Sequence, residues 1–240
     1  MLSDSGLIEG RLFSEQSQNA FIEKIREHYI SEGRYRSKII SATTPLPMNR
    51  VDVDIEIDEG PIARVKNIRF VGNMNFDDKT LREESLFDGN VLSNLLLGRN
   101  KFSEKKLEAD LENIANFYQD RGFFEFAVRS KRVVMSDDKK DVELTITVSE
   151  GDRYKFGSVV VDMVDLVSEA DMRDLVTVAE GNWFSRSEVI QSRVAIEGEL
   201  SNAGFAFAVV NPVPTVDRQT NTVGFAFVID GGHPPGSLSY

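Results

Sequence analysis

The residues of this chain that could do chemistry are few, and their spacing points away from catalysis. The two histidines, His28 and His233, lie far apart in a chain that has no cysteine. A metal site or an acid–base pair needs several such groups close together. No nucleophile elbow, Walker-type phosphate loop or dinucleotide-binding glycine motif is present either. We therefore expect no catalytic residue, no bound metal, no cofactor and no enzymatic activity.

A run of alternate carboxylates is the one pattern that could suggest a cation site. It consists of Asp52, Asp54, Glu56 and Asp58. Carboxylate oxygens are the ligands that Ca²⁺ and Mg²⁺ prefer. On a straight strand, however, alternate side chains point the same way without converging, and no glycine-centred loop surrounds these four. The pattern favours the solvated face of a strand.

The composition excludes further classes of function. The chain carries 28 Lys and Arg against 39 Asp and Glu, a net charge of −11, and no segment of it is basic. Nucleic-acid binding needs clustered positive charge, so we expect none. No apolar run approaches the roughly 20 residues that span a bilayer as a helix.

The longest apolar run of the chain contains four leucines and a valine, which are candidates for a surface that contacts a partner protein. Its residues are Val91, Leu92, Leu95, Leu96 and Leu97. The run has two interpretations. It can be a loop that folds back over the helices, which we favour, or an exposed surface for a partner, since exposed apolar runs mark interfaces.

The elements that position these residues repeat three times along the chain. Each copy has a serine that can cap a helix, apolar residues at helical spacing, and a glycine that can end the helix. The serine and glycine have the same spacing in every copy, with an aromatic residue before the serine and after the glycine. The copies run from Ser14 to Gly33, from Ser103 to Gly122 and from Ser185 to Gly204. A repeat protein is therefore predicted.

Extended segments complete each repeat. Alternating apolar residues predict closing strands that end in a turn within 51–60, 142–151 and 223–232, each preceded by another turn and extended segment. Opening strands are predicted at 62–71 and 154–161, followed by short helices capped by Asp77 or Asp78 and by Ser168. The unit is strand, short helix, long helix, strand, strand.

Closing glycines divide the chain into three repeats and a tail. The first repeat, residues 1–60, lacks an opening strand, so we expect the chain to begin inside a repeat. The second and third repeats, residues 61–151 and 152–232, are complete. Residues 233–240 read as a tail or linker.

The order of elements resembles the POTRA repeats of outer-membrane barrel assembly proteins, most closely those of the BamA family. The resemblance rests on a Thr44–Arg50 turn, an Ile68–Asn73 strand end, a Tyr118–Gly122 helix end, an Asp138–Lys140 turn and the position of the insertion between the helices. It implies an α+β fold of tandem β-α-α-β-β repeats, each a three-stranded mixed sheet covered by two antiparallel helices. The chain would then correspond to part of the family's second repeat and to its third and fourth.

The strand after the long helix distinguishes the second repeat from its neighbours. Prolines occur in the corresponding segments of the first and third repeats, at 45, 47, 212 and 214, and proline blunts a sheet edge. The segment 123–135 has none. We interpret it as an edge that accepts an extended client strand; an ordinary edge guarded by charge is the alternative. The candidate residues are Phe124, Phe126, Val128, Arg129, Ser130, Lys131, Arg132, Val133 and Val134, of which the aromatic residues and Val128 would hold the core.

The resemblance also implies a function. The chain would be a periplasmic scaffold of an outer-membrane protein that captures unfolded outer-membrane proteins and docks accessory lipoproteins, with a membrane barrel in the parent protein. Two alternatives stay open: the POTRA arm of a related transporter of the two-partner secretion type, and a passive structural spacer.

Overall fold

The computed structural model describes residues 12–87, 98, 100–162 and 172–230. The chain divides into two compact units, and the division runs through the second repeat. The first unit contains the first repeat, the Phe76–Asn113 segment and the Arg129–Thr147 segment; the second contains Gly72–Asn75, Ile114–Val128 and the third repeat. Each predicted repeat holds one sheet, so the α+β prediction is confirmed.

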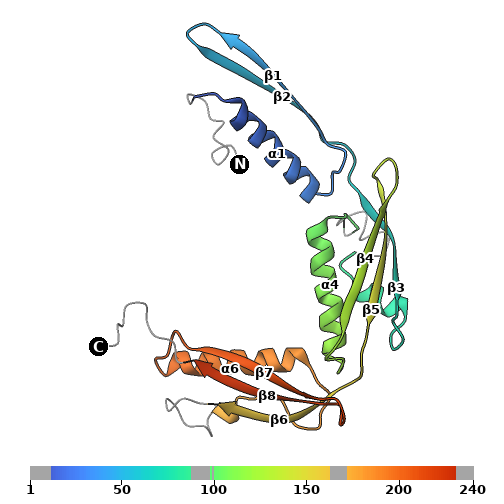
Figure 1. Cartoon of the computed structure of the whole chain (residues 1–240), viewed down its shortest axis with the longest axis vertical. Coiled ribbons are helices and arrows are strands. Elements are labelled where there is room, and N and C mark those ends of the chain that lie inside the picture. The colour runs from blue at the N-terminus through green and yellow to red at the C-terminus, as the bar shows by residue number, and fades with distance from the viewer. Residues whose placement is uncertain (1–11, 88–97, 99, 163–171, 231–240) are drawn as a thin grey trace. The chain divides into compact units, whose positions relative to one another are not determined.

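The sheet of the first repeat has two strands within the described residues. Strand β1 (Lys38–Leu46) pairs with β2 (Arg50–Asp58) in antiparallel register, from Lys38 opposite Asp58 to Leu46 opposite Arg50. Helix α1 (Glu15–Ser31) runs beside them (Figure 1). Val53 and Ile55 are half-buried, whereas Val51 and Ile57 are exposed. Two strands give the apolar face of β2 incomplete cover.

The second repeat has the order β3-β5-β4. Its strands are β3 (Arg64–Val71), β4 (Ala127–Met135) and β5 (Asp141–Ser149), and β3 pairs with β5 in parallel. Helices α2 (Asp78–Glu84) and α4 (Glu104–Gln119) lie between β3 and β4 in the sequence. The closing strand β5 is central, and its alternating apolar side chains are all buried, as predicted from their period of two. They are Val142, Leu144, Ile146 and Val148.

The third repeat has the same topology, β6-β8-β7. Strand β6 (Lys155–Asp162) is parallel to β8 (Thr222–Asp230), which is antiparallel to β7 (Val209–Asp217). Helix α6 (Arg186–Asn202) lies along this sheet (Figure 1). Ile196 and Leu200 from the helix and Phe225 and Phe227 from β8 belong to one core cluster.

The predicted helix ends are confirmed at every copy. Ser14 and Ser185 cap α1 and α6 by accepting backbone N–H groups at the third following residue, and the Ser103 hydroxyl accepts the N–H of Lys106 before α4. The glycines that follow the helices have φ of +81°, +98° and +98° at 33, 122 and 204. A left-handed residue ends a helix, and glycine adopts it without a Cβ penalty. Asp77, one of the two predicted residues, caps α2.

Several predictions fall on residues that the structure does not describe. They are the apolar patch Val91, Leu92, Leu95, Leu96 and Leu97, the Ser168 cap, the first eleven residues, and the tail 233–240.

Candidate strand-addition edge

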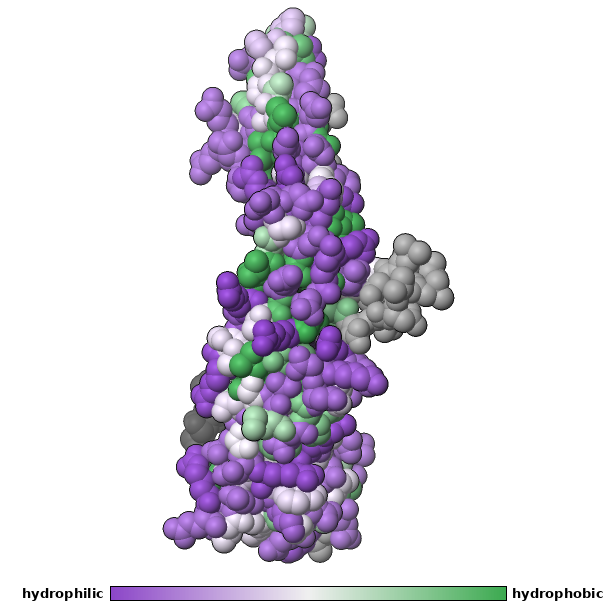
Figure 2. Space-filling view, turned by 90° about the vertical axis from the view of Figure 1, so that its right-hand side faces the viewer, coloured by the Kyte–Doolittle hydropathy of each residue, from purple (hydrophilic) through white to green (hydrophobic). Residues whose placement is uncertain are grey.

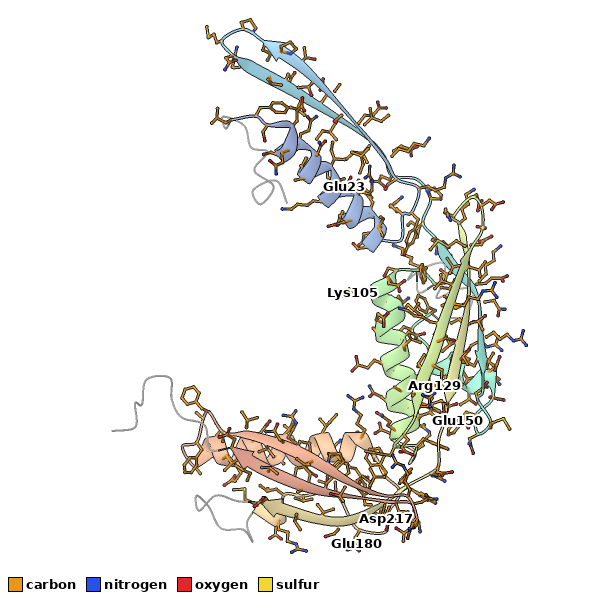
Figure 3. All side chains as sticks on the ribbon, in the orientation of Figure 1. Glu23, Lys105, Arg129, Glu150, Glu180 and Asp217 are labelled. Atoms are coloured by element: carbon orange, nitrogen blue, oxygen red, sulfur yellow. The ribbon has the colours of Figure 1, made fainter. Side chains whose placement is uncertain are left out.

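Strand β4 lies at the edge of its sheet, because the order β3-β5-β4 leaves β5 as its one neighbour among the described strands. The turn after α4 delivers the chain to this edge. Tyr118, on the last turn of α4, stacks on Phe126 at a centroid distance of 4.2 Å and meets Phe123 edge-on at 5.6 Å. These aromatic contacts hold the start of β4 against the end of α4. Figure 3 labels Arg129 on this strand.

The prediction for the start of the edge was wrong in one respect. The strand begins at Ala127, so Phe124 and Phe126 lie in the preceding turn. Phe126 is buried as predicted, but Phe124 packs against the core of the third repeat, with centroids 5.0 Å from Phe184 and 6.0 Å from Tyr154. Side-chain alternation cannot reveal that a residue packs on a neighbouring repeat. The edge itself therefore runs from Ala127 to Met135.

The side chains along β4 form a polar centre between apolar ends. Val128 and Val133 are half-buried and Val134 is 43% exposed, whereas the four residues between Val128 and Val133 are exposed. These four are Arg129, Ser130, Lys131 and Arg132. An exposed cationic centre discourages indiscriminate edge-to-edge pairing while leaving the backbone groups present.

The backbone of β4 presents N–H groups on its open side. Ser136, directly after the strand, donates its N–H to the carbonyl of Asp141 at the start of β5, at 2.9 Å. Because N–H groups alternate in direction along a strand, those of Met135, Val133 and Lys131 face away from β5. They are the groups that an added strand would use.

Helix α4 holds one of the edge cations. The Lys131 ammonium donates to the Glu104 carboxylate at 2.7 Å and also contacts Glu108. Hydrogen bonding to Glu104 is the main reason that the pKa of Lys131 is raised. The side chain of Lys131 is thus drawn toward α4, and its backbone stays at the open edge.

The corresponding edge of the third repeat is blocked. The N–H of Val210 on β7 is donated to the Glu197 carboxylate of α6 at 3.3 Å, so it points away from β8. The next two residues of β7 whose backbone nitrogens point away from β8 are Pro212 and Pro214, which pair with Phe227 and Phe225. Proline has no N–H, so three successive outward positions of β7 have no free donor.

A buried polar group anchors the end of β5 and was not predicted. Glu150, 6% exposed, accepts the Tyr118 hydroxyl at 2.9 Å and both the backbone and side-chain N–H groups of Asn75 (Figure 3). Burial and Glu150 together raise the pKa of Tyr118, so its hydroxyl stays protonated and donating. In the sequence, the only indication of this buried group is that a glutamate directly precedes the closing glycine Gly151.

Junctions between repeats use one backbone scheme twice. In the first unit, Ala63 donates its N–H to the Gly33 carbonyl at 2.8 Å and accepts the N–H of Phe102 at 2.9 Å. In the second unit, Tyr154 donates to Gly122 at 2.8 Å and accepts from Phe184 at 3.0 Å. The helix-ending glycine and the aromatic residue before the capping serine are therefore joined through the third residue of the next predicted repeat. This explains why the sequence signature contains both.

The remaining candidates provide no competing site within the described residues. The carboxylates Asp52, Asp54, Glu56 and Asp58 are all exposed on β2, in agreement with a solvated face. No group of three or more metal-ligating side chains is found in this part of the chain. None of the described helices is long and apolar enough to cross a membrane.

Comparison with known families gives matches along the chain. The family model described as "POTRA: Surface antigen variable number repeat" matches residues 1–60, 63–151 and 154–232. Among curated proteins, Outer membrane protein assembly factor BamA of Neisseria meningitidis serogroup B is 31% identical over 233 residues, which cover 96% of this chain and 29% of the relative. The protein of the same name from Buchnera aphidicola is 29% identical and covers 92% of this chain and 36% of the relative.

Solved structures show the same likeness. The crystal structure of Haemophilus influenzae BamA POTRA3-5 superposes with a TM-score of 0.59 and 26% identity, and the match covers 72% of this chain and 67% of that one. The matches cover 29% and 36% of the lengths of the two curated relatives, so the chain spans only about a third of each.

Proposed function

This chain belongs to the POTRA repeat family, and on that premise we propose that it is a periplasmic scaffold of an outer-membrane protein assembly factor. Its task in this proposal is to capture unfolded outer-membrane proteins by strand addition to β4. The relatives' name supports the assembly role, and 31% identity over 96% of the chain supports carrying it over. The proposed place in the cell is the periplasm, as part of a protein whose remaining length supplies a membrane barrel.

The edge position of β4 and the direction of its N–H groups carry the proposal. Because the Ser136 N–H is donated to β5, alternation along the strand directs the N–H groups of Lys131 and Val133 away from β5, whereas the equivalent side of β7 is blocked by two prolines and Glu197. Backbone pairing gives affinity with little dependence on the client's side chains. A receptor for many unfolded barrel proteins needs that tolerance, because its clients share an alternating strand pattern and no fixed sequence.

The expected affinity at one edge is weak. About half a dozen backbone hydrogen bonds, each contributing about 1 kcal/mol net, are largely offset by the cost of ordering the peptide. The result is a dissociation constant near millimolar, or about −4 kcal/mol. Weak capture lets a client leave again, and several sites in series add avidity.

Accessory lipoproteins are the second class of proposed partner. They come to this chain only through the resemblance to outer-membrane protein assembly factors. A scaffold of tandem repeats presents successive surfaces on which such partners can dock. A passive spacer would have no affinity for barrel strands. An arm of a secretion transporter would instead bind one secreted partner. No observation in the described part of the chain favours an enzyme.

A peptide titration tests the proposal. A synthetic peptide with the alternating apolar–polar pattern of a barrel strand is added to ¹⁵N-labelled protein while the amide shifts are followed. We expect shifts confined to Ala127–Met135 and the adjoining β5, and none on β7. An absence of shifts at about millimolar peptide would contradict strand addition.

A further inference from the structure

An exposed tryptophan in the third repeat carries two cations on its ring. Trp183 lies just before α6 and is 45% exposed. The Arg153 guanidinium lies 3.9 Å and the Lys155 ammonium 5.2 Å from the ring centroid. A backbone bridge between Lys155 and Trp183 holds the two segments together. Cations at this distance are attracted by the negative face of the indole ring.

A third cation joins them within the same unit. Arg153 donates its Nε–H to the Arg121 carbonyl at 2.7 Å, and the Arg121 guanidinium lies 3.6 Å from the ring centroid of Phe117. Arg121, Arg153, Lys155 and Trp183 are called the Trp183 cluster below. Aromatic rings and the chain backbone set the positions of its guanidinium groups, which are therefore partly ordered before any ligand arrives.

The positive charge of the Trp183 cluster is not compensated. None of its cations forms a salt bridge with a carboxylate among the described residues, although Asp152 and Glu180 are close in the sequence. By contrast, Arg218 in the same unit is paired with Glu125 at 2.7 Å. Two unpaired cations on an exposed tryptophan, with a third linked to Arg153 through its backbone carbonyl, are unexpected in a chain of net charge −11. An ion-pair role within the fold does not explain them.

We propose that the Trp183 cluster binds a short acidic segment of a partner protein, in which carboxylates flank an apolar residue. Arg121 and Arg153 can each donate hydrogen bonds from two N–H groups to a carboxylate, and Lys155 adds a point charge. Trp183 supplies the apolar contact, and both tryptophan and arginine are enriched at binding hot spots. This inference does not rest on strand addition at β4.

The charge of the rest of the chain favours a short segment over a membrane. An anionic bilayer extends beyond the cluster and would face the negative remainder of the protein, whereas a short peptide meets the cluster alone. The salt dependence of binding should be strong, because the groups are exposed.

The single tryptophan makes the test local, since no other residue of that type is present in the chain. A capped peptide of alternating glutamate and leucine is titrated while tryptophan fluorescence is recorded, with a glutamine–leucine peptide as the control probe. We expect a saturable change with the glutamate peptide alone, weakened about tenfold by Lys155→Gln and by Arg153→Gln, a loss of about 1.4 kcal/mol each. Arg173→Gln removes an exposed cation outside the cluster and should leave the affinity unchanged.

Lys155→Gln keeps the test valid if Arg153→Gln disturbs the hydrogen bond to Arg121, because Lys155 makes no side-chain hydrogen bond among the described residues. Equal responses to the two peptides, or none to either, would overturn the proposal. So would a fluorescence change with phosphatidylglycerol vesicles in the absence of any response to the glutamate peptide, which would assign the cluster to a lipid surface.

Discussion

The Glu197 carboxylate on α6 accepts the backbone N–H of Val210 on β7 at 3.3 Å, and this bond occupies a position at which an added strand would pair. Together with Pro212 and Pro214 it leaves β7 with few outward donors. Strand β4 occupies the same place in its sheet and has no proline. The two repeats share a topology (Figure 1) and differ in whether their edges are available. Figure 2 shows one mostly hydrophilic face with scattered apolar areas.

Removing one outward N–H from β4 should abolish peptide binding. In Lys131→Pro the missing N–H faces away from β5, so the internal ladder survives, as it does around Pro212 and Pro214 of β7. Lys131→Ala is the matched control, because it loses the same ion pairs with α4 and keeps the N–H. We expect the amide shifts on peptide addition to disappear in the proline variant only. Loss of binding in both variants would assign the effect to the side chain.

Opening the β7 edge should create a second binding site. Pro212→Ser and Pro214→Ser together restore two outward N–H groups, and peptide-induced amide shifts should then appear on β7 as well as on β4. The affinity at β7 should stay weak, because Glu197 still occupies the N–H of Val210. If a well-folded double variant shows shifts only on β4, then proline is not what separates the two edges.

The glycine at the junction within the second unit should tolerate substitution worse than its equivalent in the third repeat. Gly122 and Gly204 share a φ of +98°, so alanine at either costs about 1 kcal/mol or more for the left-handed conformation. A Cβ at Gly122 would also lie 2.7 Å from Cγ of Arg153, whereas nothing lies within 4 Å at Gly204. Urea unfolding followed by Trp183 fluorescence should rank Gly122→Ala as the less stable protein. Equal losses would show that Arg153 moves aside without cost.

The same junction should weaken in acid. Glu125 accepts two hydrogen bonds from Arg218, at 2.7 and 3.0 Å, and one from the Tyr154 hydroxyl at 2.9 Å. The bonds from Arg218 are the main cause of the lowered pKa of Glu125. A lowered folded-state pKa gives stability that is complete above the unfolded pKa, about 4.3, and is lost as the pH falls through the folded-state value.

Hydrogen exchange at Tyr154 and Phe184 between pH 6 and pH 3, corrected for intrinsic rates, should show this loss in the natural chain and less of it in Glu125→Gln. Both amides lie in the backbone scheme of the junction. An identical pH dependence in the two proteins would mean that Glu125 contributes nothing there.

Breaking the buried glutamate cluster should loosen the end of β5. In Glu150→Gln a neutral amide replaces the carboxylate that accepts from Tyr118 and Asn75, and we expect a loss of about 1–3 kcal/mol in local stability. Faster exchange at Val148 and Tyr118 would report it. Tyr118→Phe removes one donor and keeps the ring that stacks on Phe126, so its effect should be smaller.

Local patterns in the sequence were sufficient for the elements of this fold. Serine caps and left-handed glycines act within a few residues, so the ends of α1, α4 and α6 could be read directly. The buried face of β5 follows from period-two alternation, and the family followed from the order of elements.

Only the tertiary structure decided where Phe124 packs, which N–H groups of β4 and β7 face outward, that Glu197 covers Val210, and that Arg153 lies on Trp183. Each depends on contacts between segments that are distant in the chain, and a local pattern carries no information about its distant neighbour. The edge strand was therefore predictable as a segment, while its availability was a property of the folded repeat.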